Sequence, residues 1–106
     1  MVNLIHSVVI PRNDKIWDYS NPIEVQREAF RLLGNNAQVY KSMRPDKKYM
    51  ILNPETNKFI YFGQMEYEDF TKHNDEQRRE RFRRRNHKWA NKPHYTPAWL
   101  AYNLLW

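Results

Sequence analysis

An arginine-rich stretch in the last third of the chain most constrains what these 106 residues can form. Six of the eight positions from Arg78 to Arg85 are arginine, and Phe82 is the only apolar residue among them. Asn74 is a candidate N-cap, and the acidic residues after it suit the first turn of a helix. The stretch therefore predicts a helix over about 75–89. Phe82 and Trp89 share one face of that helix, and this apolar stripe needs a surface to dock on.

The net charge of +6 is concentrated in the same part of the chain. Residues 1–70 carry nine basic and nine acidic residues, whereas residues 71–106 carry nine basic and three acidic ones. A local excess of arginine indicates an anionic partner, such as nucleic acid, an acidic protein surface or a membrane face. The alternative is an exposed helix whose arginines pair with Glu76 and Glu80 one turn away.

A second helix is well delimited near the N-terminus. Asn21 can cap it, Pro22 suits its first position and Gly34 suits its end, so we expect a helix over about 22–33. Apolar residues recur at helical spacing, which predicts that one face packs on a core. That face consists of Ile23, Phe30 and Leu33, with Val25, Ala29 and Leu32 beside it.

Two runs rich in strand-forming residues, 47–52 and 58–62, predict a β-hairpin, because the five residues between them are mostly turn formers. Residues 2–10 are rich in valine and isoleucine and predict a further strand. Residues 35–45 are polar and are predicted to form turns.

Thr96 and Pro97 predict the start of a C-terminal helix over about 97–105. This segment is almost wholly apolar, so it has no polar face to present to water. It is either buried in the core of its own domain or inserted into a partner. The predicted apolar anchors of the chain are Phe82, Trp89, Trp99, Tyr102 and Trp106.

The predicted fold class is α+β: a hairpin with an N-terminal strand, packed with helices at 22–33, 75–89 and 97–105. We expect one small domain over 1–106, with residues 90–106 as an anchoring tail. Residues 1–46 either fold with the hairpin or form an arm, for which residues 1–20 are the candidate.

Signatures of catalysis are absent from the sequence, which has no glycine-rich phosphate loop, no GxSxG and no HExxH. Without cysteine there are no disulfides, cysteine-zinc sites or thiol nucleophiles. Glu66, Glu68 and Asp69 could hold a hard cation, but such a trio more often supplies counter-charge to a basic helix. The four histidines show no ligand spacing. We predict a non-enzymatic protein with no catalytic residue, cofactor, metal or membrane span.

Binding to nucleic acid and binding to protein both suit the arginines. Arg78, Arg81 and Arg85 form one helical row, so their side chains can follow a phosphate backbone, and Arg79 and Arg83 form a second row. Arginine and tryptophan are also enriched at protein interfaces, where the guanidinium fork clamps carboxylates. The predicted contact residues for either partner are Arg78, Arg79, Arg81, Arg83, Arg84, Arg85 and Lys88.

Residues 47–106 contain a series of short blocks in a characteristic order. These are Lys47-Lys48-Tyr49, the NPETNK turn, Phe62-Gly63, MEYEDF at 65–70, RRxRFRRRxH at 78–87 and the TPxW…LLW ending. In this series the chain resembles short basic proteins of large double-stranded DNA viruses, and similar sequences occur in some tailed phages.

The resemblance implies a virion protein that is present in the host cytoplasm or nucleus during assembly. The leading expectation is a minor capsid component that bridges larger viral capsid proteins through arginine and tryptophan contacts. The alternative is a sequence-independent nucleic-acid-binding protein that uses the 78–85 helix on double-stranded DNA or RNA.

Overall fold

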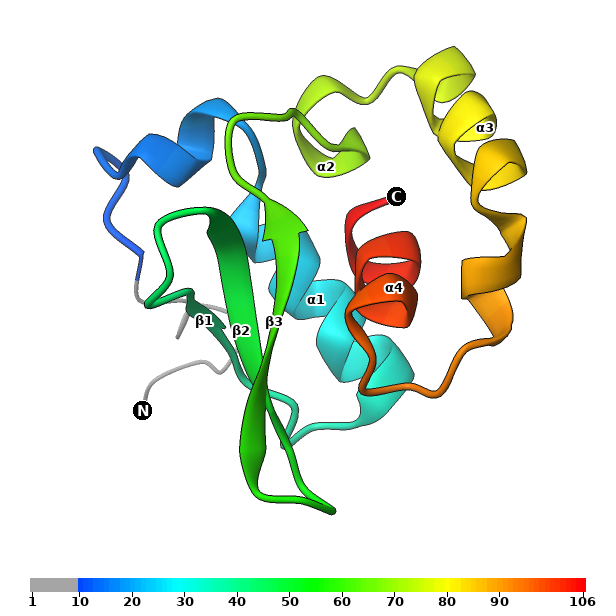
Figure 1. Ribbon diagram of the computed structural model, residues 1–106. Helices are drawn as coiled ribbons and strands as arrows, with labels where there is room; N and C mark the ends of the chain where they lie inside the picture. The colour runs from blue at the N-terminus through cyan, green and yellow to red at the C-terminus, as the bar shows by residue number, and fades with distance from the viewer. Residues whose placement is uncertain (1–9) are drawn as a thin grey trace.

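The computed structural model describes residues 10–106 (Figure 1). It is a mixed α+β fold with one three-stranded antiparallel sheet and several helices, which confirms the predicted class. The predicted N-terminal strand lies outside the described residues except for Ile10, whose side chain is buried in the core. Ile16 is buried there too, so residues 10–20 contribute directly to that core.

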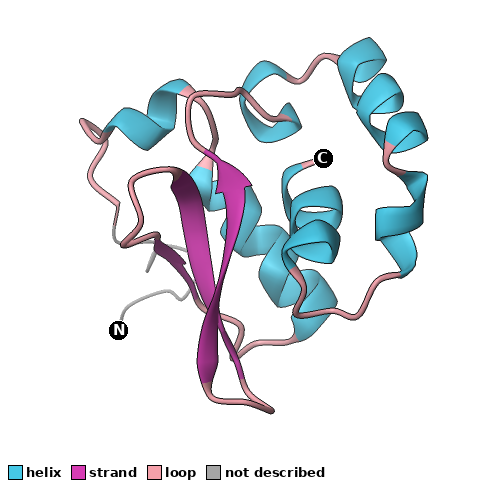
Figure 2. Ribbon diagram, viewed as in Figure 1, coloured by secondary structure: helices cyan, strands magenta, loops and turns pink. Residues whose placement is uncertain are grey.

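The elements follow one another along the chain as helices, then strands, then helices (Figure 2). They are the 3-10 helix η2 (Lys15–Asp18), α1 (Pro22–Leu33), β1 (Val39–Lys41), β2 (Lys47–Asn53), β3 (Lys58–Gln64), α2 (Phe70–His73), α3 (Glu76–Arg85), the 3-10 helix η3 (His87–Asn91), α4 (Pro97–Leu100) and the π-helical turn η4 (Ala101–Leu105). Figure 1 shows the sheet at one side of the molecule, α1 and α4 in the middle, and α3 at the other side.

The boundaries of α1 are those predicted from the sequence. The Asn21 side chain accepts a hydrogen bond from the Ile23 amide (3.1 Å), and the helix ends at Gly34, whose φ is 102°. The centre of the predicted core face is displaced, however: Val25 and Ala29, predicted beside that face, are fully buried, whereas the Ile23, Phe30 and Leu33 side chains are only half-buried. Both β1 and η4 pack against α1, so its buried face is set by these two elements.

Strand β1 was predicted as a turn region. It pairs with β2 through Val39–Ile51 and Lys41–Tyr49. The buried side chain of Gln26 binds the start of this strand, because it accepts from the Val39 amide and donates to the Ala37 carbonyl, both at 2.8 Å. A three-residue strand carries too little pattern to be recognised from the sequence, and Gln26, which binds its start, lies 13 residues before Val39.

The predicted hairpin is confirmed as β2 and β3, with Tyr49 opposite Phe62 and Ile51 opposite Ile60. These residues are on the inner face of the sheet. Near its end, β3 approaches η4 so closely that a Cβ at Gly63 would lie 2.8 Å from Leu105 Cδ1. Gly63 also has a φ of 79°, so both sterics and backbone conformation favour glycine there.

The apolar C-terminal segment is buried in the core of its own domain. Helices α4 and η4 together cover the predicted range 97–105, and Thr96 caps them by accepting from the Trp99 amide (3.3 Å). The Trp99 side chain is 6% exposed, and Leu100, Leu104 and Leu105 are buried around it. The side chains of Tyr102 and Trp106 are half-buried and face α3.

Replacing Trp99 tests whether this segment is part of the core. We expect Trp99→Ala to lower the free energy of unfolding by about 3–5 kcal/mol, because the change removes a buried aromatic side chain and leaves a cavity. Tyr40→Ala is the control, since Tyr40 is 43% exposed. Urea unfolding followed by circular dichroism measures both, and a loss below about 1 kcal/mol for Trp99→Ala would contradict this packing.

Candidate functional site

Helix α3 begins at Glu76, one residue later than the start predicted with Asn74 as the N-cap. Asp75 is the N-cap, and its carboxylate accepts from the amides of Gln77 (3.0 Å) and Arg78 (3.2 Å). Asn74 instead ends α2 in a left-handed conformation, with φ 55°. The predicted end at position 89 is also wrong.

The helix stops at Arg85. The Phe82 carbonyl accepts from both the main-chain amide and the side-chain amide of Asn86, each at 3.0 Å. The chain continues as the 3-10 helix η3, which contains Trp89. The continuous helix expected over 75–89 is therefore two helical segments joined at Asn86.

The apolar stripe on α3 docks on the chain's own C-terminal residue. Phe82 stacks on Trp106 with ring centroids 4.3 Å apart and planes 6° apart. Trp89 meets Phe82 edge to face at 5.9 Å. The Tyr102 ring lies 6.5 Å from that of Phe82, so four of the five predicted anchors form one aromatic cluster within the domain.

Two of the arginines also bind the C-terminal residue. Arg79 and Arg83 donate from Nε to the main-chain oxygen of Trp106, at 2.7 and 3.0 Å. Their guanidinium groups lie over the rings of Phe70 and Tyr102. Burial, and then the charge of Arg79, lower the pKa of Arg83. This row of the helix is therefore occupied by contacts inside the molecule.

The other row, Arg78, Arg81 and Arg85, is exposed and lines a cleft of about 750 Å³. Within residues 10–106, no carboxylate lies within 4 Å of these three guanidinium groups, and their side chains make no hydrogen bond. Of the other predicted contact residues, Arg84 pairs with Glu80 (2.5 Å) and Lys88 is exposed. Of the arginines on α3, only Arg78, Arg81 and Arg85 therefore line the cleft.

The cleft is bounded by α3 on one side and by β3, the loop after it and the α4–η4 segment on the other. Its aromatic lining is provided by Phe62, Tyr67, Phe82, Trp89 and Trp106. Lys47 and Glu68 also line it, so the wall opposite α3 has no net charge apart from the buried Lys48. Basic and aromatic side chains thus face the same space.

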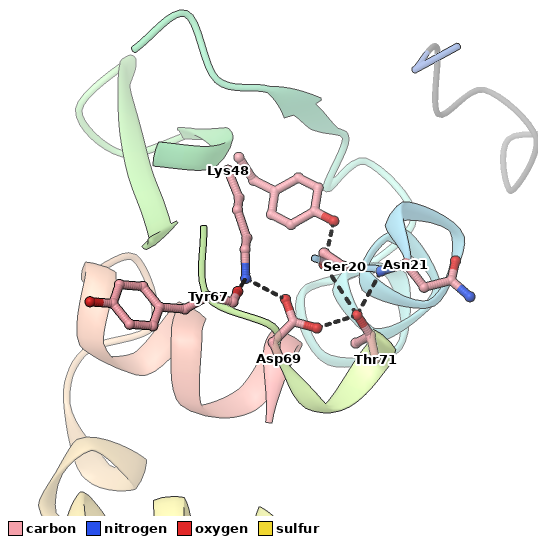
Figure 3. Close-up of polar contacts among 7 residues, drawn as sticks. Ser20, Asn21, Lys48, Tyr67, Asp69 and Thr71 are labelled. Carbon is pink, nitrogen blue, oxygen red and sulfur yellow. Dashed lines mark hydrogen bonds and ion pairs between the residues drawn. The ribbon is translucent and has the colours of Figure 1, made fainter. Parts of the chain in front are cut away.

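A buried ion pair holds the loop that forms this opposite wall (Figure 3). Lys48 and Asp69 have side chains that are 2% and 1% exposed, and they pair at 3.1 Å. Lys48 Nζ also donates to the Tyr67 carbonyl, while Asp69 accepts from the Thr71 hydroxyl (2.5 Å). Burial lowers the pKa of Lys48, and the charge of Asp69 opposes that shift.

The same network reaches α1. The Thr71 hydroxyl accepts from the Asn21 amide (2.8 Å) and lies 3.1 Å from Ser20 Oγ, which accepts from the Tyr49 hydroxyl (2.7 Å). The network fixes the Tyr67 backbone, and in Figure 3 the Tyr67 ring points away from it. The tyrosine side chain itself is 67% exposed.

The sequence analysis missed this pair and the residues of the loop wall. Glu66, Glu68 and Asp69 were expected to supply counter-charge to the arginine helix. Instead, Asp69 pairs with Lys48, Glu66 lies 3.8 Å from Lys15, and Glu68 lines the cleft. The one available signal was Lys48, which directly precedes the apolar run Tyr49–Leu52 in the same predicted strand.

The comparisons with known proteins give one match. Residues 37–86 match a model described as a family of unknown function (DUF5754). This range includes the sheet, the Lys48–Asp69 pair and α3, but neither α1 nor the α4–η4 segment. No curated protein and no solved structure matches the chain.

Across residues 10–106, no helix is both long enough and apolar enough to cross a membrane. Within that range, no three or more histidine, aspartate or glutamate side chains gather in a way that could hold a metal ion.

Single and double substitutions of the buried pair test its role. Lys48→Met or Asp69→Leu alone should cost about 3–5 kcal/mol of unfolding free energy, because each leaves an uncompensated charge in the interior. The double variant should recover much of that loss. Urea unfolding of all four proteins measures the coupling. Additive losses in the double variant would show that the two charges do not depend on each other.

The stability of the protein should fall in mild acid because of His73. Its Nδ1 accepts from the Asp75 amide (2.9 Å), and its buried Nε2 has no partner among residues 10–106. Burial, and then the charge of Arg78, lower the pKa of His73 below its ordinary value of 6.5. Below pH 6.5 the unfolded chain therefore takes up the proton first.

We accordingly expect the free energy of unfolding to be highest above pH 6.5 and to decrease as the pH falls through the folded-state pKa of His73. His73→Gln should flatten this part of the profile, since it removes the titrating group. Chemical unfolding between about pH 7 and pH 5 measures the effect. An identical slope in the variant would assign the pH dependence to other groups.

Proposed function

We propose that this protein binds nucleic acid without sequence preference, through the Arg78 row of α3. The observation that carries the proposal is that Arg78, Arg81 and Arg85 are exposed side by side at a cleft, with no counter-charge within 4 Å of their guanidinium groups among residues 10–106. Phosphate groups would supply that counter-charge.

The other arginines of the chain give the comparison that supports this choice. Arg27, Arg31 and Arg84 each pair with a glutamate three or four residues away, at 2.7, 2.5 and 2.5 Å. Arg79 and Arg83 bind Trp106, as described above. Among the six arginines of α3, the three without a hydrogen bond or ion pair inside residues 10–106 therefore form one row.

The arrangement also suits phosphate better than base edges. The row extends about 10 Å along the helix axis, at 1.5 Å per residue, which allows contacts to successive phosphates of one strand. Contacts to phosphate position a protein on nucleic acid but carry no sequence information. The proposal is therefore one of backbone recognition.

The test is DNA binding at two salt concentrations, with mixed-sequence DNA offered as a single strand and as a duplex. Wild-type protein should bind at least one form, and three phosphate contacts should weaken binding about 20- to 40-fold between about 50 and about 200 mM salt. Changing Arg78, Arg81 and Arg85 to Gln should remove this share of the salt dependence. Fluorescence anisotropy measures both.

The matched control is a triple Gln variant of Arg27, Arg31 and Arg44. It changes the net charge by the same amount, but these residues lie on α1 and in the loop before β2, where they pair with glutamates or lie over Tyr61. It should bind almost as well as wild type. Equal losses in the two triple variants would mean that net charge, rather than the row, attracts DNA.

A minor capsid component that bridges larger viral capsid proteins is our second proposal. The observation that favours it is an apolar surface on the outer face of the sheet, where Tyr40, Leu52 and Phe59 are exposed and the two rings meet at 6.0 Å. Under this proposal the cleft arginines would clamp carboxylates of another protein. Failure of wild-type protein to bind either form of DNA would leave this as the better proposal.

A further inference from the structure

We infer that the strand bound in the cleft is single-stranded, with its phosphates along α3 and its bases stacked on the aromatic lining, chiefly on Tyr67. This inference rests on the proposed function and specifies its ligand. It is carried by the joint presence of cationic and aromatic side chains in one cleft.

The charges of the two walls indicate how a strand would lie. Arg78, Arg81 and Arg85 make the α3 wall strongly cationic. On the opposite wall the charges of Lys47 and Glu68 offset each other. A phosphate backbone is thus drawn to α3, and the bases attached to it are directed toward the uncharged, aromatic side of the cleft.

The aromatic lining offers a contact that a duplex cannot use. In a duplex the base faces are covered by neighbouring base pairs, so only phosphates, sugars and groove edges reach a protein surface. In a single strand the faces are free and stack on aromatic side chains with little dependence on sequence. The volume of about 750 Å³ lies in the range of pockets that enclose small organic groups.

Tyr67 is the best placed of these rings for stacking. Its side chain is 67% exposed, so it is free to accept a base on one face. Its backbone is held by Lys48, whose ammonium group donates to the Tyr67 carbonyl and is itself paired with Asp69. A fixed backbone reduces the ordering cost when a base stacks on the ring.

An acidic peptide is the alternative occupant, and the observations favour it less. Its carboxylates would satisfy the Arg78 row equally well. It would make no particular use of an exposed tyrosine and a tryptophan in the same space, whereas nucleic-acid bases offer a π-face at every position. This alternative is an outcome of the test.

The experiment compares a single strand of about 15 nucleotides with a duplex of the same sequence, using wild type, Tyr67→Ala, Tyr67→Phe and Tyr40→Ala. The full chain is used throughout. Tyr67→Ala should weaken single-strand binding about tenfold to a hundredfold and leave duplex binding unchanged, since it removes one stacking surface. Tyr67→Phe should bind as wild type, because it retains the ring. Tyr40→Ala removes an exposed tyrosine outside the cleft and should have no effect.

The outcomes separate this inference from the proposed function. Equal binding of both DNA forms that depends on the Arg78 row but not on Tyr67 would overturn the inference and keep the function. Absence of binding to either form would overturn both. Displacement of the single strand by polyglutamate at an equal concentration of negative charge would identify the cleft as a carboxylate site and overturn the inference.

Discussion

Packing of the C-terminal segment at the centre of the molecule is the interaction on which the rest of the structure depends. Trp99, Leu100, Leu104 and Leu105 are buried between the sheet and α1. Burial of side chains of this kind contributes roughly 1.5–3 kcal/mol each, a large share of what stabilises a domain of this size. The last residue of the chain, Trp106, is thereby fixed at a defined place beside α3.

Helix α3 has no core-facing surface of its own, since none of its residues is fully buried. A helix this polar is stabilised by its tertiary contacts rather than by an apolar face. Here those contacts are the ring of Phe82 on Trp106 and the bonds from Arg79 and Arg83 to the Trp106 oxygen. Because these contacts use one side of the helix, the Arg78 row is turned toward the cleft.

The opposite wall of the cleft depends on a different interaction, the buried ion pair between Lys48 and Asp69. A buried ion pair adds little net stability, but separating its two charges inside the protein is costly, so the two groups stay together. Lys48 and Asp69 thereby fix the loop that carries Tyr67 and Glu68. One wall of the cleft is thus set by aromatic stacking and the other by a polar network.

The sequence by itself determined the α+β class, the hairpin, the extent of α1 and the range of the C-terminal helix. Each of these has a local cause: strand-forming runs around a turn, a cap with proline and glycine at the two ends, or an apolar run that water excludes. The sequence also located all of the excess charge in residues 71–106.

Only the tertiary structure decided how those parts are used. Identical arginines were separated into a row bound to Trp106 and a row facing the cleft, a distinction that spacing alone cannot make because both rows have helical periodicity. Strand β1, the buried face of α1 and the Lys48–Asp69 pair each depend on partners more than ten residues away. Such contacts are set by packing, which a local pattern does not encode.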